Sequence, residues 1–206
     1  MTDPFINSIF QFTQDFRENK ELIFNAVTSL NARVVVELGT DVGDSTRILA
    51  SALMRTGGHL WTIDVARPNW EMTHIRRVNN SLGTDTTEAS PMPQVMEYFK
   101  DVVTVITSDS LKVDWKSGID LLFIDSLHEA FHVASELEKY GTLVRVGGLI
   151  LLHDTHHKQF GDGIRGAIEV WAKSKGKQFK YFLSDKPEEN VGGDVIRDNG
   201  LGVIYV

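Results

Sequence analysis

Carboxylates and imidazoles follow two apolar stretches in the second half of the chain. Asp125 comes directly after residues 119–124, and His153 and Asp154 come directly after residues 149–152. If the two stretches are neighbouring parallel strands, their carboxyl ends lie about 4.8 Å apart. Two carboxylates that close repel each other unless a cation or a shared proton lies between them. We therefore expect a divalent cation at Asp125 and Asp154. The alternative is that Asp125 caps the next helix and Asp154 anchors its loop.

The ligand types bear on the choice of cation and base. Oxygen ligands suit Mg²⁺ or Ca²⁺, whereas imidazoles favour Mn²⁺, Zn²⁺ or Fe²⁺. Five of the seven histidines fall between residues 127 and 158, namely His128, His132, His153, His156 and His157. An imidazole with a pKa of about 6.5 can remove a proton from a hydroxyl group that a metal has acidified. We expect His128 as the general base, with His156 as the second candidate and with His132 and His157 structural or exposed.

A strand, a glycine turn and a helix are predicted in the first half of the chain. Residues 34–38 are an apolar run, Gly39 and Gly43 form the turn, and Asp44 or Ser45 is the expected N-cap of the helix. Such a turn brings a ligand to bare backbone and to the free N–H groups of a helix start. The next strand ends in Asp64, about 20 residues on, where nucleotide-binding βαβ units carry a ribose-binding carboxylate.

The charge of this turn argues against a dinucleotide. A pyrophosphate would lie beside Glu37, Asp41 and Asp44, and like charges in contact cost on the order of 1–4 kcal/mol in a fairly polar environment. A ligand with a cationic end fits better. S-adenosylmethionine has a sulfonium and an ammonium group for the acid at the strand end, and Asp64 would take its ribose hydroxyls.

Taken together, the motifs resemble those of a known enzyme family. Residues 36–46 with Asp64 look like the first two motifs of class I S-adenosylmethionine-dependent methyltransferases. Residues 121–128 and 146–154 are similar to the small, often metal-dependent O-methyltransferase branch (methyltransferase family 24-like), which includes catechol-type, macrolide-sugar and cephalosporin-biosynthesis enzymes. The resemblance implies an α/β, Rossmann-like class I methyltransferase fold. That fold has a seven-stranded, mostly parallel sheet with helices on both faces and an antiparallel last strand.

The resemblance also implies roles for individual residues. Metal ligands would be Asp125 with Asp154 and either His153 or Thr155, and His128 stands where catechol-type relatives carry a lysine. Ser108 and Asp109 would contact the adenine ring, with a turn or cap as the alternative role of Asp109. With the residues already discussed, the expected cofactor-binding set is Glu37, Gly39, Thr40, Gly43, Ser45, Asp64, Ser108, Asp109 and Asp125. The expected catalytic set is Asp125, His128 and His156.

The expected reaction is in-line transfer of a methyl group to a hydroxyl of a small molecule, catalysed by positioning and electrostatics. Three other interpretations share parts of the pattern. An NAD-linked oxidoreductase shares the strand, turn and helix. A metal-dependent hydroxylase or hydrolase would use Asp125, His153 and Asp154 as ligands. A non-catalytic module would bind the cofactor alone.

Length and composition limit the remaining possibilities. A chain of 206 residues with 42% apolar content suits one domain, residues 1–206. No cysteine is present, which excludes disulfides and thiolate ligands and is compatible with a reducing compartment. We expect a cytoplasmic protein, because no apolar run is long enough for a membrane span and the start lacks signal-peptide features. A net charge of −7 argues against nucleic acid as substrate, and the oligomeric state is left open.

The remaining elements must position these groups. We expect a helical segment over residues 1–30. The insertion over 65–100 is a candidate lid with Trp70 and Met72 as apolar contacts, and a plain insertion is the alternative. We also expect a helix over 129–143, a turn over 145–148 and a helix over 163–173 capped by Asp162. Further strands are predicted over 102–107, 177–183 and 201–206, with turns at Gly192-Gly193 and Asn199-Gly200.

Overall fold

The computed structural model describes residues 19–41, 43–65, 97–183, 189–191, 194–196 and 199–206. Most of the predicted insertion over 65–100, including Trp70 and Met72, lies outside these ranges, as do residues 1–18 and Gly192-Gly193. The candidate lid and the single domain over 1–206 therefore stay predictions.

Seven strands form one mixed sheet in the order β3-β2-β1-β4-β5-β9-β6. Their bounds are β1 (Val34–Leu38), β2 (His59–Asp64), β3 (Val103–Thr107), β4 (Ile119–Ile124), β5 (Val144–His153), β6 (Gln178–Phe182) and β9 (Leu201–Tyr205). Strands β1 to β5 are parallel, and the last strand, β9, is antiparallel to both β5 and β6. This arrangement confirms the predicted Rossmann-like sheet. A separate hairpin pairs β7 (Glu189–Val191) with β8 (Asp194–Ile196).

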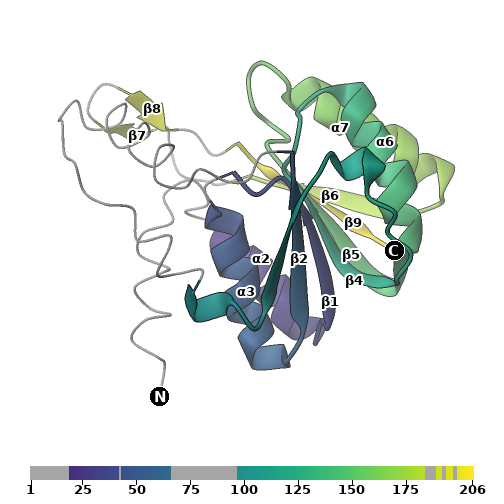
Figure 1. Ribbon diagram of the computed structural model, residues 1–206. Helices are drawn as coiled ribbons and strands as arrows, with labels where there is room; N and C mark the ends of the chain where they lie inside the picture. Colours follow the sequence, from purple (N-terminus) through teal and green to yellow (C-terminus); the bar gives the residue numbers. More distant parts are fainter. Residues whose placement is uncertain (1–18, 42, 66–96, 184–188, 192–193, 197–198) are drawn as a thin grey trace.

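Helices cover both faces of the sheet (Figure 1). Helices α2 (Asn19–Ser29) and α3 (Asp44–Thr56) pack on one face, and α6 (Ala130–Tyr140) and α7 (Gly161–Ser174) pack on the other. Two short 3₁₀-helices, η1 (Ser110–Lys112) and η2 (Gly141–Leu143), join these elements. Within the described ranges, none of the helices combines the length and the apolar character needed to cross a bilayer.

The central strand β4 shows why the sequence folds this way. All of its residues, Ile119–Ile124, are buried, because helices cover both faces of a parallel sheet. Helix α6 turns Val133, Leu137 and Tyr140 toward this sheet at helical spacing. The predicted bounds of β4 are confirmed. The predicted helix over 129–143 divides into α6 and η2.

The strand order reverses between β1 and β4, and ligands of open α/β sheets bind outside the carboxyl ends of strands at such a point. Gly39 follows β1 there with a φ of +91°. A Cβ at this position would overlap the carbonyl oxygen of Asp125 and lie 2.9 Å from the Cα of Ser126. Only glycine lets the end of β1 approach the end of β4 this closely.

Two predicted helix caps are wrong. The N-cap of α3 is Gly43, which has no side chain, and Ser45 instead donates a hydrogen bond to Glu37. Helix α7 begins at Gly161 with Phe160 as N-cap, so Asp162 lies in the first turn, where it forms an ion pair with Arg165. In both cases the polar residue near the helix start has a partner other than the backbone N–H groups.

The predicted turn over residues 145–148 is also wrong, because β5 already begins at Val144. The pairing of β4 with β5 jumps from Ile119–Val144 to Leu121–Leu149, which is a bulge on β5. Gly147 supplies the positive φ, +84°, that this bulge uses. The glycines therefore bend a continuing strand instead of ending it.

Candidate active site

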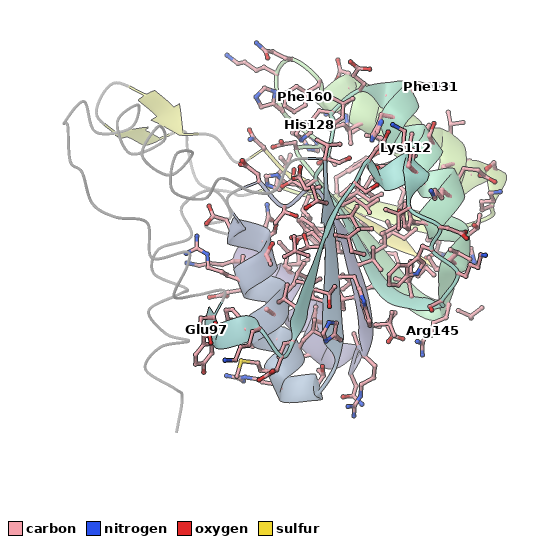
Figure 2. The ribbon with its side chains drawn as sticks, in the orientation of Figure 1. Glu97, Lys112, His128, Phe131, Arg145 and Phe160 are labelled. Carbon is pink, nitrogen blue, oxygen red and sulfur yellow. The ribbon has the colours of Figure 1, made fainter. Side chains whose placement is uncertain are left out.

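Four ionisable side chains meet at the carboxyl ends of β4 and β5. Nε2 of His128 lies 3.3 Å from Oδ1 of Asp125 and 2.9 Å from Oδ2 of Asp154. Nδ1 of His153 lies 3.4 Å from the same Asp125 oxygen and 3.2 Å from Oδ1 of Asp154. The pairing of Ile124 with Leu152 places the two strand ends side by side. The structure thus brings together Asp125, His128, His153 and Asp154. Figure 2 shows His128 at the end of the molecule opposite Arg145.

Three of these residues are arranged as metal ligands are. One ligand atom from each of Asp125, His128 and Asp154 lies within 4.8 Å of the other two. Oδ1 of Asp154 is buried and, within the described part of the chain, has an ion-pair contact with Nδ1 of His153 at 3.2 Å but no assigned hydrogen bond. Asp154 also has a strained φ of +59°, an outlier of the kind found at functional sites. The donor set and the unsatisfied oxygen both fit a divalent cation.

The charges in this cluster depend on one another. Burial disfavours the charged imidazolium, yet the two carboxylates outweigh it and raise the pKa of His128 to about 9 and that of His153 to about 10. Burial likewise opposes ionisation of Asp125 and Asp154, but the neighbouring imidazoles hold the pKa of each carboxyl below its usual value. Both carboxylates therefore stay ionised, and a cation drawn to them competes with the imidazole protons.

An aromatic stack holds the ring of His128. Phe160 stacks on His128 with ring centroids 4.4 Å apart, and His157 stacks on Phe160 with centroids 3.7 Å apart. Figure 2 shows Phe160 next to His128. Sequence reasoning missed Phe160 and assigned no role at the site to His157. No spacing rule predicts this stack, because it depends on the path of the loop after β5.

His156 and Thr155 lie on another side of the loop. Nδ1 of His156 is 3.0 Å from Oγ1 of Thr155, and its ring meets Tyr181 edge-on at 5.6 Å. A Cβ on Gly200 would lie 2.5 Å from the same nitrogen. The structure places these two residues against β6 and the start of β9, and it does not bring them into the group of Asp125, His128 and Asp154.

Glu37 is the buried acid at the end of β1. Its two oxygens accept hydrogen bonds from Ser45 Oγ at 2.5 Å and from Thr46 Oγ1 at 2.6 Å. Burial raises the pKa of Glu37 to about 7, although these two hydrogen bonds oppose the shift. Glu37 therefore fastens the first turn of α3 to β1. Its expected contact with the cofactor stays a prediction.

Asp64 lies where the sequence predicted it, beside the glycine turn. Its Oδ2 accepts hydrogen bonds from the backbone N–H of Thr40 at 2.8 Å and of Asp41 at 3.1 Å. The backbone N–H of Gly43 donates to the carbonyl of Thr40 at 2.7 Å and closes the turn. The expected ribose-binding carboxylate is therefore held against the turn that follows β1.

Ser108 and Asp109 follow β3. Oδ1 of Asp109 accepts a hydrogen bond from the backbone N–H of Leu111 at 2.9 Å and caps η1. Ser108 Oγ donates to the carbonyl of Asp109 at 3.2 Å. The capping role weighed for Asp109 is thus observed, and contact of either residue with adenine stays a prediction.

Comparison with solved structures shows the same fold. A protein described as a putative caffeoyl-CoA O-methyltransferase from Staphylococcus aureus is 17% identical to this chain and superposes with a TM-score of 0.65. The match covers 98% of this chain and 92% of that chain. An O-methyltransferase from Bacillus cereus, solved with S-adenosylhomocysteine, is 19% identical, with a TM-score of 0.64 and coverages of 100% and 92%. TomG from Streptomyces achromogenes, an O-methyltransferase of tomaymycin synthesis solved with S-adenosylmethionine, is 17% identical, with a TM-score of 0.63 and coverages of 100% and 91%.

A family model described as a methyltransferase domain matches residues 36–155. That range is more than half of the chain, and it contains the glycine turn, Asp64, Asp125, His128 and Asp154. The resemblance seen in the sequence motifs is confirmed. The chain belongs to this methyltransferase family.

Proposed function

We propose that this S-adenosylmethionine-dependent methyltransferase methylates a hydroxyl oxygen of a small molecule with the help of a divalent cation. The observation that carries the proposal is the contact between the glycine turn and the end of β4, where Gly39 lies against Asp125. This contact joins the crevice at the strand reversal to the carboxylate and imidazole cluster. A methyl donor in the crevice therefore lies next to an acceptor at the cluster.

The crevice suits the donor better than a dinucleotide. Asp41 lies in the glycine turn and Asp64 lies beside it. Their carboxylates repel a pyrophosphate. The same carboxylates favour a ligand with a sulfonium and an ammonium group. Asp64 would take the ribose hydroxyls, and Ser108 and Asp109 would lie on the adenine side.

The cluster suits the acceptor. Asp125, His128 and Asp154 would hold the cation. The buried Oδ1 of Asp154 accepts no assigned hydrogen bond from the described part of the chain, so it is available as a ligand atom. A bound divalent cation lowers the pKa of a coordinated hydroxyl and fixes its orientation. The carboxylates orient the acceptor. His128 takes the hydroxyl proton when the two carboxylates alone hold the cation; when its Nε2 is a ligand, a neighbouring base takes that proton.

The transfer itself is a single displacement. The acceptor oxygen forms a bond to the methyl carbon while the carbon–sulfur bond breaks, and the electron pair of that bond stays on sulfur. The products are the methyl ether, S-adenosylhomocysteine and one proton. The protein contributes alignment of oxygen, carbon and sulfur, which is catalysis by positioning.

A cysteine-free chain suits a reducing compartment, so the cytoplasm is the proposed location.

Two variants test the assignment of the two halves of the site. Asp125→Asn and Asp154→Asn should abolish methylation and weaken Mn²⁺ binding, measured by electron paramagnetic resonance, because each removes a charged ligand. Both should bind S-adenosylhomocysteine nearly as the wild type does. Asp114→Asn is the matched control, since Asp114 is 77% exposed and pairs only with a neighbouring lysine among the ion pairs described.

The acceptor is sought with a panel of phenols, sugars and hydroxy acids, with and without a chelator. Methylation that the chelator abolishes and Mn²⁺ restores supports the proposal. Methylation that survives the chelator would remove the cation from the mechanism. Loss of S-adenosylhomocysteine binding in both Asp variants would move these residues from the acceptor site to the donor site.

A further inference from the structure

A buried carboxylate lies in the middle of α6, outside the cluster described above. The side chain of Glu136 is fully buried. Its Oε1 accepts hydrogen bonds from Ser110 Oγ at 2.6 Å and from His132 Nε2 at 3.1 Å, and its Oε2 accepts one from Ser126 Oγ at 2.7 Å. Burying a carboxylate is costly unless such donors surround it. Packing alone therefore does not explain a carboxylate at position 136.

Glu136 connects two segments that are far apart in the sequence. Ser110 begins η1, just after the predicted adenine-side residues 108 and 109, and Ser126 directly follows Asp125 at the end of β4. Helix α6 holds the first segment at further points, because Tyr140 Oη donates to the carbonyl of Ser110 and Lys139 Nζ donates to the carbonyl of Leu111, each at 2.6 Å. The loops that follow β3 and β4 are thus fixed to one helix.

The hydrogen bonds also fix the direction of the serine hydroxyls. Each serine has a single O–H to donate. Ser110 and Ser126 both donate that hydrogen to Glu136. The oxygen of Ser126 can therefore only accept a further hydrogen bond. Ser110 is buried, whereas Ser126 is half-buried and lies against the glycine turn beside Gly39.

We propose that Glu136 is a positioning residue that makes Ser126 Oγ an obligatory acceptor for the exocyclic amino group of the adenine ring. The inference rests on the proposed binding of S-adenosylmethionine in the crevice. It gives this chain a means of selecting a 6-aminopurine, which donates a hydrogen bond at that edge, over a 6-oxopurine, which accepts one. A buried pair of facing acceptors leaves both groups unsatisfied.

The test compares S-adenosylhomocysteine with its deaminated form, S-inosylhomocysteine, in which an oxo group replaces the amino group at C6 and the neighbouring ring nitrogen N1 carries a hydrogen. Calorimetry on the full chain gives the ratio of their dissociation constants. The wild type should prefer S-adenosylhomocysteine by about 10- to 100-fold, the usual effect of one unsatisfied buried polar group. Glu136→Gln should reduce the ratio to within about threefold, because the amide donates to one serine and frees a hydroxyl hydrogen to turn toward the oxo group.

Three further variants separate positioning from structure. Glu136→Asp keeps an acceptor-only group and should keep the preference even if both affinities fall. Ser126→Ala, which leaves Glu136 in place, should remove the preference and covers the case in which Glu136→Gln does not fold. Glu138→Gln is the matched control on the same helix, because Glu138 is 61% exposed and faces Lys175, and it should leave the ratio unchanged.

The outcomes distinguish this inference from the proposed function. If Glu136→Gln and Ser126→Ala both lower the two affinities equally and leave the ratio intact, Glu136 is only structural and the inference is overturned. A wild type that binds both ligands equally would overturn it as well. A wild type that binds neither ligand would overturn the proposed function itself.

Discussion

Nε2 of His128 lies 2.9 Å from Oδ2 of Asp154, although the two residues come from the loops after different strands. The same nitrogen is 3.3 Å from Oδ1 of Asp125. One imidazole therefore faces both carboxylates of the predicted acceptor site. This contact makes His128 the residue of the cluster with the most direct access to a hydroxyl held there, either as a ligand or as a base.

Removing this imidazole should stop the chemistry without affecting the donor. His128→Ala is expected to lower kcat by about 10²- to 10⁴-fold, the usual effect of losing a general acid or base. Its dissociation constant for S-adenosylhomocysteine should stay near the wild-type value. Initial rates with an acceptor that the wild type methylates, together with calorimetry, give both quantities.

His156→Ala is the control for that experiment. His156 contacts Thr155 and Tyr181 away from the carboxylates, so its loss should lower kcat by less than about tenfold, below the range of a general base. A larger loss in His156→Ala than in His128→Ala would exchange the roles of the two histidines.

The aromatic stack should matter through His128. Phe160→Leu removes the ring that lies 4.4 Å from His128, and stacked aromatic pairs contribute about 0.5–1.5 kcal/mol. We expect weaker Mn²⁺ binding and a kcat lower by roughly 2- to 10-fold, with S-adenosylhomocysteine binding unchanged. Phe160→Tyr keeps the stack and should behave like the wild type. Equal Mn²⁺ affinity in both variants would deny the stack any positioning role.

Glu37 should make stability depend on pH. Because its pKa is about 7 in the folded chain and near 4.5 when unfolded, the native carboxyl keeps a proton that the unfolded chain has released between these values. The free energy of unfolding should therefore fall as pH rises through this window, by on the order of 3 kcal/mol in total. Well above the folded-state pKa the loss is complete.

Glu37→Gln has no such proton to lose. Urea denaturation at a series of pH values across this window gives the free energy of unfolding of the wild type and of the variant. As pH rises, the wild type should lose stability relative to Glu37→Gln. Glu97→Gln, at a side chain that is 72% exposed, is the control without this shift. A constant difference for Glu37→Gln would mean that the buried carboxyl titrates normally.

Gly39 should be irreplaceable for a steric reason. Gly39→Ala combines a φ of +91° with overlap on Asp125, whereas Gly176→Ala has a φ of +65° and, among the described residues, open space around the new Cβ. Gly176→Ala should cost only the strain of a left-handed residue, about 1–2 kcal/mol. Gly39→Ala should cost more and also lose S-adenosylhomocysteine binding. Similar effects of both changes on stability and binding would refute the close contact.

The sequence predicted the parts of the fold that follow from simple rules. A buried parallel strand must be continuously apolar, so the bounds of Ile119–Ile124 were predictable. A right-handed crossover through one helix makes the next strand a neighbour, and this rule alone places Asp125 close to Asp154. The caps of α3 and α7 failed because their polar residues bind side chains instead of backbone.

The contacts that complete the site were less accessible. The stack on Phe160 depends on the loop path after β5, which no periodicity describes. The sequence patterns assigned no role to Glu136, although it shares the buried stripe with Val133, Leu137 and Tyr140. A carboxylate at helical spacing within an apolar stripe is the signal that would have found it.

Calorimetric titration of the full chain with S-adenosylhomocysteine, with NADH as the comparison, tests the central claim most directly. The account predicts saturable binding of S-adenosylhomocysteine at one site per chain and no binding of NADH, because the acidic rim at Asp41 and Asp64 repels the pyrophosphate. Binding of NADH without binding of S-adenosylhomocysteine would contradict it.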